Sequence, residues 1–307
     1  MIPRNARTRT AIRTRASLRI TSLQRYKQLS YMQQYNKAPL PFQGQKRRWI
    51  SEMRQLASII PQGATVVDLF GGSGLCSHTI KQARPDLTVI WNDYDDYQSR
   101  LDHIGVTNEQ CDALRHITES LNKYNRIDKD TPLHKAIFDY LAQQKYIDWE
   151  TVGTIISFSS SDKKQPSTAH HLYNCVPKTP YSADGYLDGV TRVQMDYSDL
   201  LKKAPKDAIL VVDPPYLTTT AERYGKRQDD VYWGLSEHIR LLNHIKGRKF
   251  IYFSSSKSEI LELNAVIKEL LGVSYLGDFS CREKDANLGN GTHGYQDLLI
   301  TNLPLHA

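Results

Sequence analysis

The stretch between residues 64 and 83 constrains the fold of this 307-residue chain most. A run rich in β-branched residues ends at Asp68, leads into a glycine-rich turn and continues as a helix-like segment to Ala83. The turn contains Gly71, Gly72 and Gly74. Glycines let a backbone turn sharply and approach a ligand closely, and the first amides of a helix can face a polar group. The stretch therefore predicts the first strand, turn and helix of an α/β protein, with a ligand at the turn.

A second predicted strand also ends at an acid. Leu87 to Asn92 is mostly apolar, and Asp93 comes directly after it. A carboxylate in this place can accept hydrogen bonds from both hydroxyls of a ribose. A dinucleotide-binding turn would have a third glycine where this chain has Ser77, and it usually lacks an acid at the end of the first strand. The pattern therefore favours a nucleoside site of another kind.

The segment from Ile209 to Tyr216 predicts a chemical site at the end of another buried strand. Its apolar part stops at Asp213 and two prolines, Pro214 and Pro215, which hold the next turn in a rigid, non-helical conformation. Open α/β sheets bind their ligands at the carboxyl ends of the strands. Asp213 offers acceptor oxygens and Tyr216 a flat ring with a polar tip. This combination suits an amino group on a planar base.

An amino group of that kind needs activation. The amino nitrogen of adenine is a poor nucleophile because its lone pair is delocalised into the ring. Asp213 and the backbone carbonyl of Pro214 could each accept one of its two hydrogens. The lone pair would then point out of the ring plane, toward an electrophile.

These stretches resemble motifs of S-adenosylmethionine-dependent DNA methyltransferases that modify amino groups. Residues 213–216 match their Asp-Pro-Pro-Tyr motif, and the acid-x-aromatic-Gly-x-x-Gly pattern formed by Asp68, Phe70, Gly71 and Gly74 matches their cofactor motif. The resemblance implies that the glycine turn packs against S-adenosylmethionine and that the acid helps to hold its cationic end. It also implies that Tyr216 stacks on an extruded adenine.

Two shorter matches flank these motifs. Phe42, Gly44 and Lys46 resemble the aromatic-x-Gly-x-Lys loop that closes over the methionine end of the cofactor in the same enzymes, although a plain basic turn has the same composition. Asp196 and Tyr197 precede the Asp213 strand at about the spacing of the adenine-side cofactor motif. A helix cap is the alternative reading of Asp196.

The order of the motifs resembles that of the bacterial and phage Dam adenine methyltransferases. The resemblance implies a Rossmann-like, doubly wound α/β methyltransferase sheet with an inserted, mostly helical target-recognition region. We divide the chain into a basic arm (1–38), a cofactor-binding part (39–100), a recognition insertion (101–190) and a catalytic part (191–307). The patterns that accompany GATC recognition in the Dam enzymes are absent from this sequence, so the target sequence is not carried over.

Periodicity predicts further elements along the chain. Helices are expected over Ser22 to Tyr35, Trp49 to Ile60, Asn108 to Tyr124, His134 to Gln144, Tyr232 to Ile245 and Ser258 to Leu271, and strands over Lys249 to Ser254 and Gln296 to Thr301.

Positive charge is concentrated at the amino end. Residues 1–51 contain twelve Lys and Arg residues and no acid, whereas the remainder has a net charge of −5. Such an arm attracts a polyanion such as DNA, although a solvated tail or an organelle transit peptide has a similar composition. The further residues expected to contact DNA are basic and lie near the motifs or in the insertion: Arg47, Arg48, Lys163, Lys164, Lys178, Arg223 and Arg227.

Composition excludes several other classes of protein. No apolar run approaches the roughly 20 residues of a membrane-spanning helix. The four cysteines are far apart and form no CxxC pair, so we expect free thiols in a reducing, cytoplasmic compartment. The histidines show no metal-binding spacing, and we expect no metal.

We interpret the chain as an enzyme that transfers methyl from S-adenosylmethionine to the N6 amino group of adenine in DNA, by base flipping and direct in-line transfer. Cytosine N4 is a competing target because it presents the same amino geometry, but serine usually replaces the aspartate in the resembling cytosine enzymes. A catalytically inactive DNA-binding protein on the same fold, and an enzyme that methylates amino groups of RNA or protein, are further alternatives.

Overall fold

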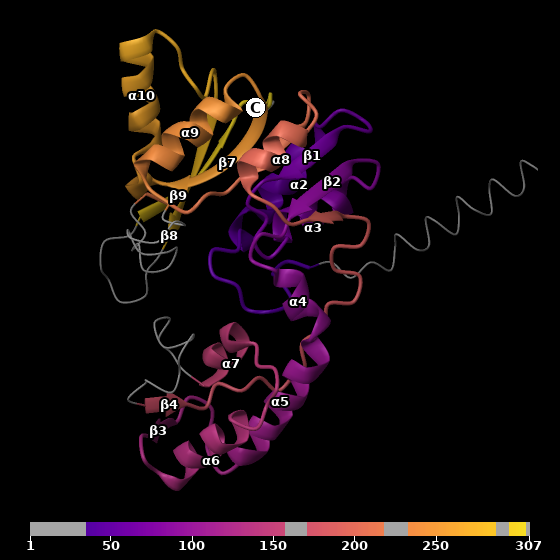
Figure 1. Ribbon diagram of the computed structural model, residues 1–307, viewed down its shortest axis with the longest axis vertical. Helices are drawn as coiled ribbons and strands as arrows, with labels where there is room; N and C mark the ends of the chain where they lie inside the picture. Colours follow the sequence, from indigo (N-terminus) through magenta and orange to yellow (C-terminus); the bar gives the residue numbers. More distant parts are fainter. Residues whose placement is uncertain (1–34, 157–170, 218–232, 287–294, 305–307) are drawn as a thin grey trace, which may run out of the picture.

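The computed structural model describes residues 35–156, 171–217, 233–286 and 295–304 (Figure 1). Nearly all of the basic arm, and of the helix expected from Ser22 to Tyr35, lies outside the described residues. The described chain forms a larger lobe around a central sheet and a smaller, mainly helical lobe that projects from it.

The central sheet has seven strands. They are β1 (Thr65–Asp68), β2 (Thr88–Asn92), β5 (Thr191–Val193), β6 (Ile209–Val212), β7 (Lys249–Ser255), β8 (Ser280–Ala286) and β9 (Tyr295–Thr301). Their order is β5-β2-β1-β6-β7-β9-β8, and the pairs are parallel except those that β9 makes with β7 and β8. The strand order reverses between β1 and β6, which is where open α/β sheets bind ligands. The predicted doubly wound α/β fold is confirmed.

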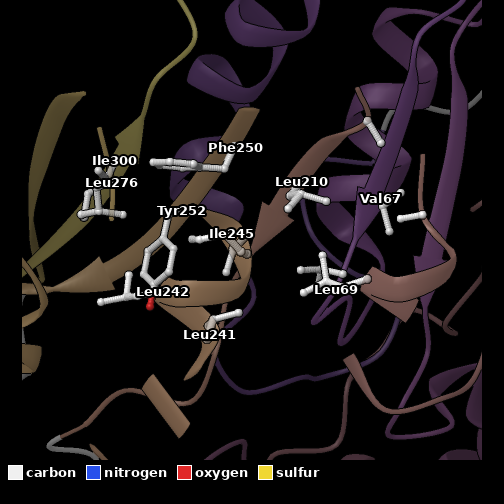
Figure 2. Close-up of a cluster of buried hydrophobic side chains, with 14 of the residues drawn as sticks. Val67, Leu69, Leu210, Leu241, Leu242, Ile245, Phe250, Tyr252, Leu276 and Ile300 are labelled. Carbon is white, nitrogen blue, oxygen red and sulfur yellow. The ribbon is translucent and has the colours of Figure 1, made fainter. Parts of the chain in front are cut away.

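Both faces of β6 are buried, and this explains its continuous apolar run. Ile209 and Val211 pack into a cluster with α2 (Ile50–Ser58) and α3 (Leu75–Ala83). Leu210 and Val212 face the other way, into a cluster with α8 (Tyr197–Lys203), α9 (Leu235–Ile245) and α10 (Ile260–Leu271). Figure 2 shows this second cluster, with side chains from neighbouring strands lying side by side. Strands buried on both faces lose the alternation of polar and apolar residues.

The smaller lobe corresponds to the middle of the chain. It contains α5 (Ile104–Ile117), α6 (Pro132–Leu141), α7 (Trp149–Ile156) and an antiparallel pair, β3 (Arg126–Asp128) and β4 (His171–Tyr173). The short helix α4 (Tyr97–Asp102) precedes it, at the junction of the two lobes (Figure 1). The lobe has its own hydrophobic cluster, which includes Leu114, Ile137 and Val152. Its role in target recognition stays a prediction.

Most predicted elements are confirmed, with shifts at their ends. The helix expected from Trp49 begins as a 3-10 turn, η1 (Arg47–Trp49), and the one expected from Ser258 follows another, η4 (Ser256–Ser258). The helix expected over Asn108 to Tyr124 begins and ends earlier, as α5. Several elements were not predicted: α4, α7, β3, β4, β5 and β8.

All four cysteines are free thiols, as expected. None of the helices in the described part of the chain combines the length and the apolar character that crossing a membrane would require.

Candidate active site

The ends of β1 and β6 bring two predicted site residues to neighbouring positions. In the parallel pairing, Asp68 lies opposite Val211, and the Leu69 amide donates to the Val211 carbonyl at 2.9 Å. Asp213 is the residue directly after the end of β6, two positions past the partner of Asp68. Because two prolines come next, this segment cannot continue as a helix. Both carboxylates lie at the point where the strand order reverses.

Lys46, from the loop at residues 42–46, contacts Asp213 at the end of β6. Its Nζ lies 2.5 Å from Oδ2 of Asp213 and donates to the Gly44 carbonyl at 2.8 Å. The Lys46 and Asp213 side chains expose only 12% and 22% of their surface. The ammonium also lies 5.5 Å from the ring centre of Tyr216. Two sequence motifs that are distant in the chain therefore converge on one ion pair.

The electrostatics of the pair depend on its burial. Burial raises the pKa of Asp213 above its ordinary value, and the Lys46 ammonium only partly opposes this rise. Burial works in the opposite direction on Lys46, but the charge of Asp213, its hydrogen bond and the nearby Tyr216 together outweigh burial, and the pKa of Lys46 is raised. Burial also raises the pKa of Tyr216, so its phenol is neutral at physiological pH. The site is thus built around a cation held next to a carboxylate.

Asp68 is a second buried carboxylate in this group. It is 2% exposed, and Ser77 Oγ donates to its Oδ2 at 2.8 Å. Burial raises the pKa of Asp68 to about 7, with Ser77 opposing the rise and the charge of Asp213 adding to it. In the part of the chain that the structure describes, no cation lies within 4 Å of this carboxylate.

The glycines of the turn are required by close packing. A Cβ on Gly71 would lie 2.0 Å from Cδ1 of the Trp91 side chain, and one on Gly72 would lie 2.8 Å from the Phe42 ring. Gly72 also has a φ of 47°, which side chains other than glycine rarely adopt. Gly74, with a φ of 75°, is the N-cap of α3. The Phe42–Lys46 loop therefore contacts the glycine turn at one end and Asp213 at the other.

Asp93 lies at the end of β2, where it was expected, but its contacts are structural. It is fully buried, and its carboxylate accepts from the amides of Tyr97 at 2.6 Å and Gln98 at 3.0 Å. It also accepts from Nε of Arg192 at 2.7 Å. The carboxylate thus caps α4 and pairs with an arginine of β5. Its predicted contact with a ribose stays a prediction.

Asp196 and Tyr197, the residues predicted to lie at the adenine end of the cofactor, are next to a cluster of aromatic rings. Asp196 is the N-cap of α8 and accepts from the Ser198 amide at 2.8 Å, which is the alternative reading of this residue. The Tyr197 ring stacks on Phe70, with 5.3 Å between the ring centres. Trp233 lies edge-on to both rings. The structure therefore brings Phe70 and Tyr197 together, and it adds a tryptophan.

The predicted DNA-contacting residues are scattered. Arg47 and Arg48 are exposed on η1, next to Lys46, and Lys178 is exposed in the smaller lobe. The remaining four lie outside the described residues: Lys163, Lys164, Arg223 and Arg227.

A comparison with curated proteins identifies the family. A protein of Haemophilus influenzae that carries the name "Putative methyltransferase" is 34% identical over 238 residues, which are 74% of this chain and 78% of that protein. The chain belongs to this family of methyltransferases. No protein-family model matches it.

Solved structures similar to this methyltransferase are distant in sequence. Precorrin-6y C5,15-methyltransferase from Geobacter metallireducens is 9% identical, with a TM-score of 0.35, over 88% of this chain and 98% of its own. An rRNA methylase from Streptococcus thermophilus is 8% identical, with a TM-score of 0.31, over 83% of this chain and 95% of its own. Likenesses of this strength say nothing about what this methyltransferase modifies.

The residues of this methyltransferase fit the methyl donor that its family implies. Asp68 is a buried carboxylate without a cation within 4 Å among the described side chains. Burying a charge in this way is costly, and a cationic group of a ligand would offset the cost. S-adenosylmethionine carries an ammonium and a sulfonium. The chemistry of the acceptor at the end of β1 therefore suits this cofactor.

The sequence reasoning missed several residues that shape the methyltransferase site. Ser77, noted only because it is not glycine, bonds Asp68. Asn92 bonds the Leu69 carbonyl at 3.0 Å and both backbone groups of Met195, which fixes β1, β2 and the segment after β5 together. Asn92 could have been noticed in the sequence because it is a polar residue at the end of an apolar strand, directly before Asp93. No spacing pattern marks Ser77.

His238 is another residue that was missed. Nε1 of Trp233 donates to Nε2 of His238 at 3.0 Å, beside the backbone of Pro215. Burial lowers the pKa of His238 to about 4, so its ring is neutral and can accept this bond. The imidazole thus connects the aromatic group to the loop that carries Asp213.

Proposed function

We propose that this methyltransferase transfers methyl from S-adenosylmethionine to the N6 amino group of adenine in DNA. The observation that carries the proposal is the contact between Lys46 and Asp213, next to Asp68, at the reversal of the sheet. It joins the loop implied in cofactor binding to the carboxylate implied in base binding. A shared reaction site requires this proximity.

Asp213 would act on the amino group of the base. The carboxylate and the Pro214 carbonyl accept one amino hydrogen each, which directs the nitrogen lone pair away from the ring. The prolines keep this segment extended, so the two acceptors are positioned before the base arrives. The methylated nitrogen must lose one proton, and the carboxylate that already accepts its N–H is placed to take it.

Lys46 would keep Asp213 ionised. Burial alone favours the protonated carboxyl, which cannot accept two amino hydrogens as well as the carboxylate does. The Lys46 ammonium, 2.5 Å from Asp213, counters this effect. The same ammonium also donates to the Gly44 carbonyl of its own loop. Tyr216, with its neutral phenol, offers its ring to the base by stacking.

The cofactor, when bound, would supply an electrophilic methyl group. Asp68 would hold the cationic methionine end, and Phe42 would lie over the glycine turn beside it. Phe70 and Tyr197, whose rings are stacked, would pack near the adenosine. These roles, and the proposed contact of Asp93 with the ribose, are assigned by the motifs and by position at the ends of the strands.

DNA as the partner is supported by the distribution of charge. The insertion, residues 101–190, contains nine basic and twelve acidic residues, so attraction for phosphates must come from elsewhere. The arm and the exposed Arg47 supply it, because positive charge that neutralises phosphates releases counterions. The base must leave the stack, which costs on the order of a few kcal/mol in a duplex and less in a single strand.

The test is product analysis. The full chain is incubated with radiolabelled S-adenosylmethionine and, in separate reactions, with unmethylated duplex DNA, single-stranded DNA, RNA and protein, and labelled nucleosides are then identified by mass spectrometry. N6-methyladenine in DNA is the expected product. N4-methylcytosine, or label confined to RNA or protein, would overturn the proposed target. The Asp213→Ala variant should give at least about 100-fold less label, while Asp199→Ala, which changes an exposed carboxylate on α8, should match the wild type.

A further inference from the structure

Lys284, on the edge strand β8, makes three contacts with η1 and the first turn of α2. Its Nζ lies 2.7 Å from Oε1 of Glu52 and donates to the Arg48 carbonyl at 2.6 Å. It also lies 4.7 Å from the ring centre of Trp49. The Lys284 and Glu52 side chains are 29% and 15% exposed, so the ion pair is largely shielded from water. Shielded pairs that also bond the backbone fix geometry better than exposed pairs do.

Neighbouring residues of β8 strengthen the same connection. Arg282 Nη1 donates to Oε1 of Gln55 at 3.0 Å, one turn further along α2. In the other direction, the Arg48 guanidinium donates to the Asp285 carbonyl. Polar contacts run both ways between η1, the first turns of α2 and one edge strand. The charged sequence of β8 therefore has a structural use.

The segment held by Lys284 begins at the residue that touches Asp213. Lys46 is the N-cap of η1, and its carbonyl accepts the Trp49 amide at 2.9 Å. Lys284 bonds the carbonyl of the residue before Trp49 and covers the Trp49 ring. A shift of this single turn would move the Lys46 backbone, and with it the ammonium at Asp213.

Strand β9, which pairs with β8, places a charged residue near the Lys46–Asp213 ion pair. Asp297 of β9 lies directly opposite Lys284, and residues directly opposite in an antiparallel pair project from the same face. The half-buried Asp297 carboxylate interacts electrostatically with both Lys46 and Asp213. The face of the β8–β9 hairpin that carries Lys284 is thus the face next to the ion pair.

We propose that Lys284 is a positioning residue, which holds η1 in place so that Lys46 stays on Asp213. Its consequence for catalysis rests on the proposed function, but its effect on Lys46 does not. If Lys284 only stabilised the edge of the sheet, its loss would lower the melting temperature without changing the surroundings of Lys46.

The experiment measures the surroundings of Lys46 directly. The full-length protein is acetylated with a limiting amount of an N-hydroxysuccinimide ester, and the rate at each lysine is read by mass spectrometry. Lys284→Met should raise the rate at Lys46 by roughly tenfold, because loss of the anionic partner lowers the lysine pKa by about one unit. Lys202→Met, which removes an exposed pair on α8, is the matched control and should leave Lys46 unchanged.

Further variants separate positioning from folding. Lys284→Arg can keep the ion pair and the carbonyl bond, so Lys46 should stay protected. Glu52→Gln removes the pair but retains Lys284, and a smaller increase at Lys46 is expected; this variant also serves if Lys284→Met does not fold. An unchanged rate at Lys46 in a folded Lys284→Met protein, or in folded Glu52→Gln in its place, overturns the proposal.

Turnover gives the second readout. Lys284→Met should lower kcat for methyl transfer more than it raises KM for the cofactor, and Lys284→Arg should restore kcat. If Asp213→Ala retains activity, the proposed function fails, while the acetylation result on Lys284 stands by itself. The two failures are therefore distinguishable.

Discussion

The carboxyl ends of β6 and β2 carry the same sequence signal with different outcomes. Each strand is apolar and is followed by an aspartate. Asp213, after β6, is 22% exposed and pairs with Lys46 from a different motif. Asp93, after β2, is fully buried and bonds two amides and an arginine.

The residues that come after each aspartate explain the difference. Pro214 and Pro215 have no amide hydrogens, so neither can donate to the Asp213 carboxylate as the first amides of a capped helix would. Asp93 precedes α4, whose first amides need an acceptor, and the carboxylate supplies it. A strand-end acid is thus available for chemistry when the next residues do not require it as a cap. Substitutions at the strand ends and at Lys46 test this contrast.

Replacement of Asp213 should affect activity most. Asp213→Ala removes the proposed acceptor of the amino hydrogen, and methyl transfer should fall by about 10²- to 10⁴-fold, the range typical of a proton-transfer group. Cofactor binding, measured by calorimetry, should stay near normal. Retained activity, or loss of cofactor binding together with activity, would contradict the role given to the end of β6.

Replacement of Lys46 should have the next largest effect. Lys46→Met leaves Asp213 buried without its cation, so a smaller fraction of the carboxyl is ionised at neutral pH. We expect turnover at pH 7 to fall by roughly 10- to 100-fold, because the lost bond between charged groups is worth about 1.5–3 kcal/mol. Lys202→Met is the control. If Lys46→Met turned over as fast as this control, the ion pair would be unimportant for catalysis.

Replacement of Asp68 should change stability in a pH-dependent way. The pKa of Asp68 is raised to about 7 by burial in the folded protein, against about 3.8 when unfolded. Between these values the folded state holds a proton that the unfolded state has lost, so this contribution to stability is lost as the pH rises. The free energy of unfolding of Asp68→Asn, measured with denaturant, should therefore exceed that of the wild type by about 1 kcal/mol or more at pH 8, but not at pH 4.

The Asp68→Asn variant should also bind S-adenosylmethionine more weakly at pH 8. Unchanged affinity would place the cationic end of the cofactor elsewhere. A stability difference that was larger at pH 4 than at pH 8 would contradict the effect of burial on Asp68.

Replacement of Asp93 should have the smallest effect on chemistry. Asp93→Asn leaves the amide and arginine donors with fewer acceptors, and the free energy of unfolding should fall by about 1–3 kcal/mol. Turnover of the folded fraction should change by only a few-fold if the carboxylate is structural. A selective loss of cofactor affinity with unchanged stability would instead favour the ribose role, and it would break the contrast with Asp213.

The sequence predicted the parts of the fold that have local signals. The run from Ile209 to Val212 ends at two prolines, and the run ending at Asp68 leads into glycines, so both strands and their ends were evident. The short strand β5 and the charged strand β8 were not predicted, because both lie at the edges of the sheet and have no apolar pattern. α7 is short and contains Gly153 among β-branched residues, which weakens its helix signal.

The site was predicted as separate motifs, and their contacts were not. Residue types identified Lys46 and Asp213, but their pairing depends on how the loop at residues 42–46 folds back over the sheet. Similarly, Ser77 bonds Asp68 and His238 bonds Trp233, and both bonds depend on how the backbone between the two partners turns. Such contacts depend on tertiary structure, and one sequence contains no periodic signal for them.

The pH dependence of methyl transfer shows which form of the Asp213 carboxyl group works. If the Asp213 carboxylate is the working form, kcat/KM of the wild type should fall as the pH drops through a pKa above the ordinary aspartate value of 3.8. In Lys46→Met this acidic limb should move to higher pH, because burial then acts on Asp213 without the opposing ammonium. Coincident acidic limbs, or a shift to lower pH, would contradict the account.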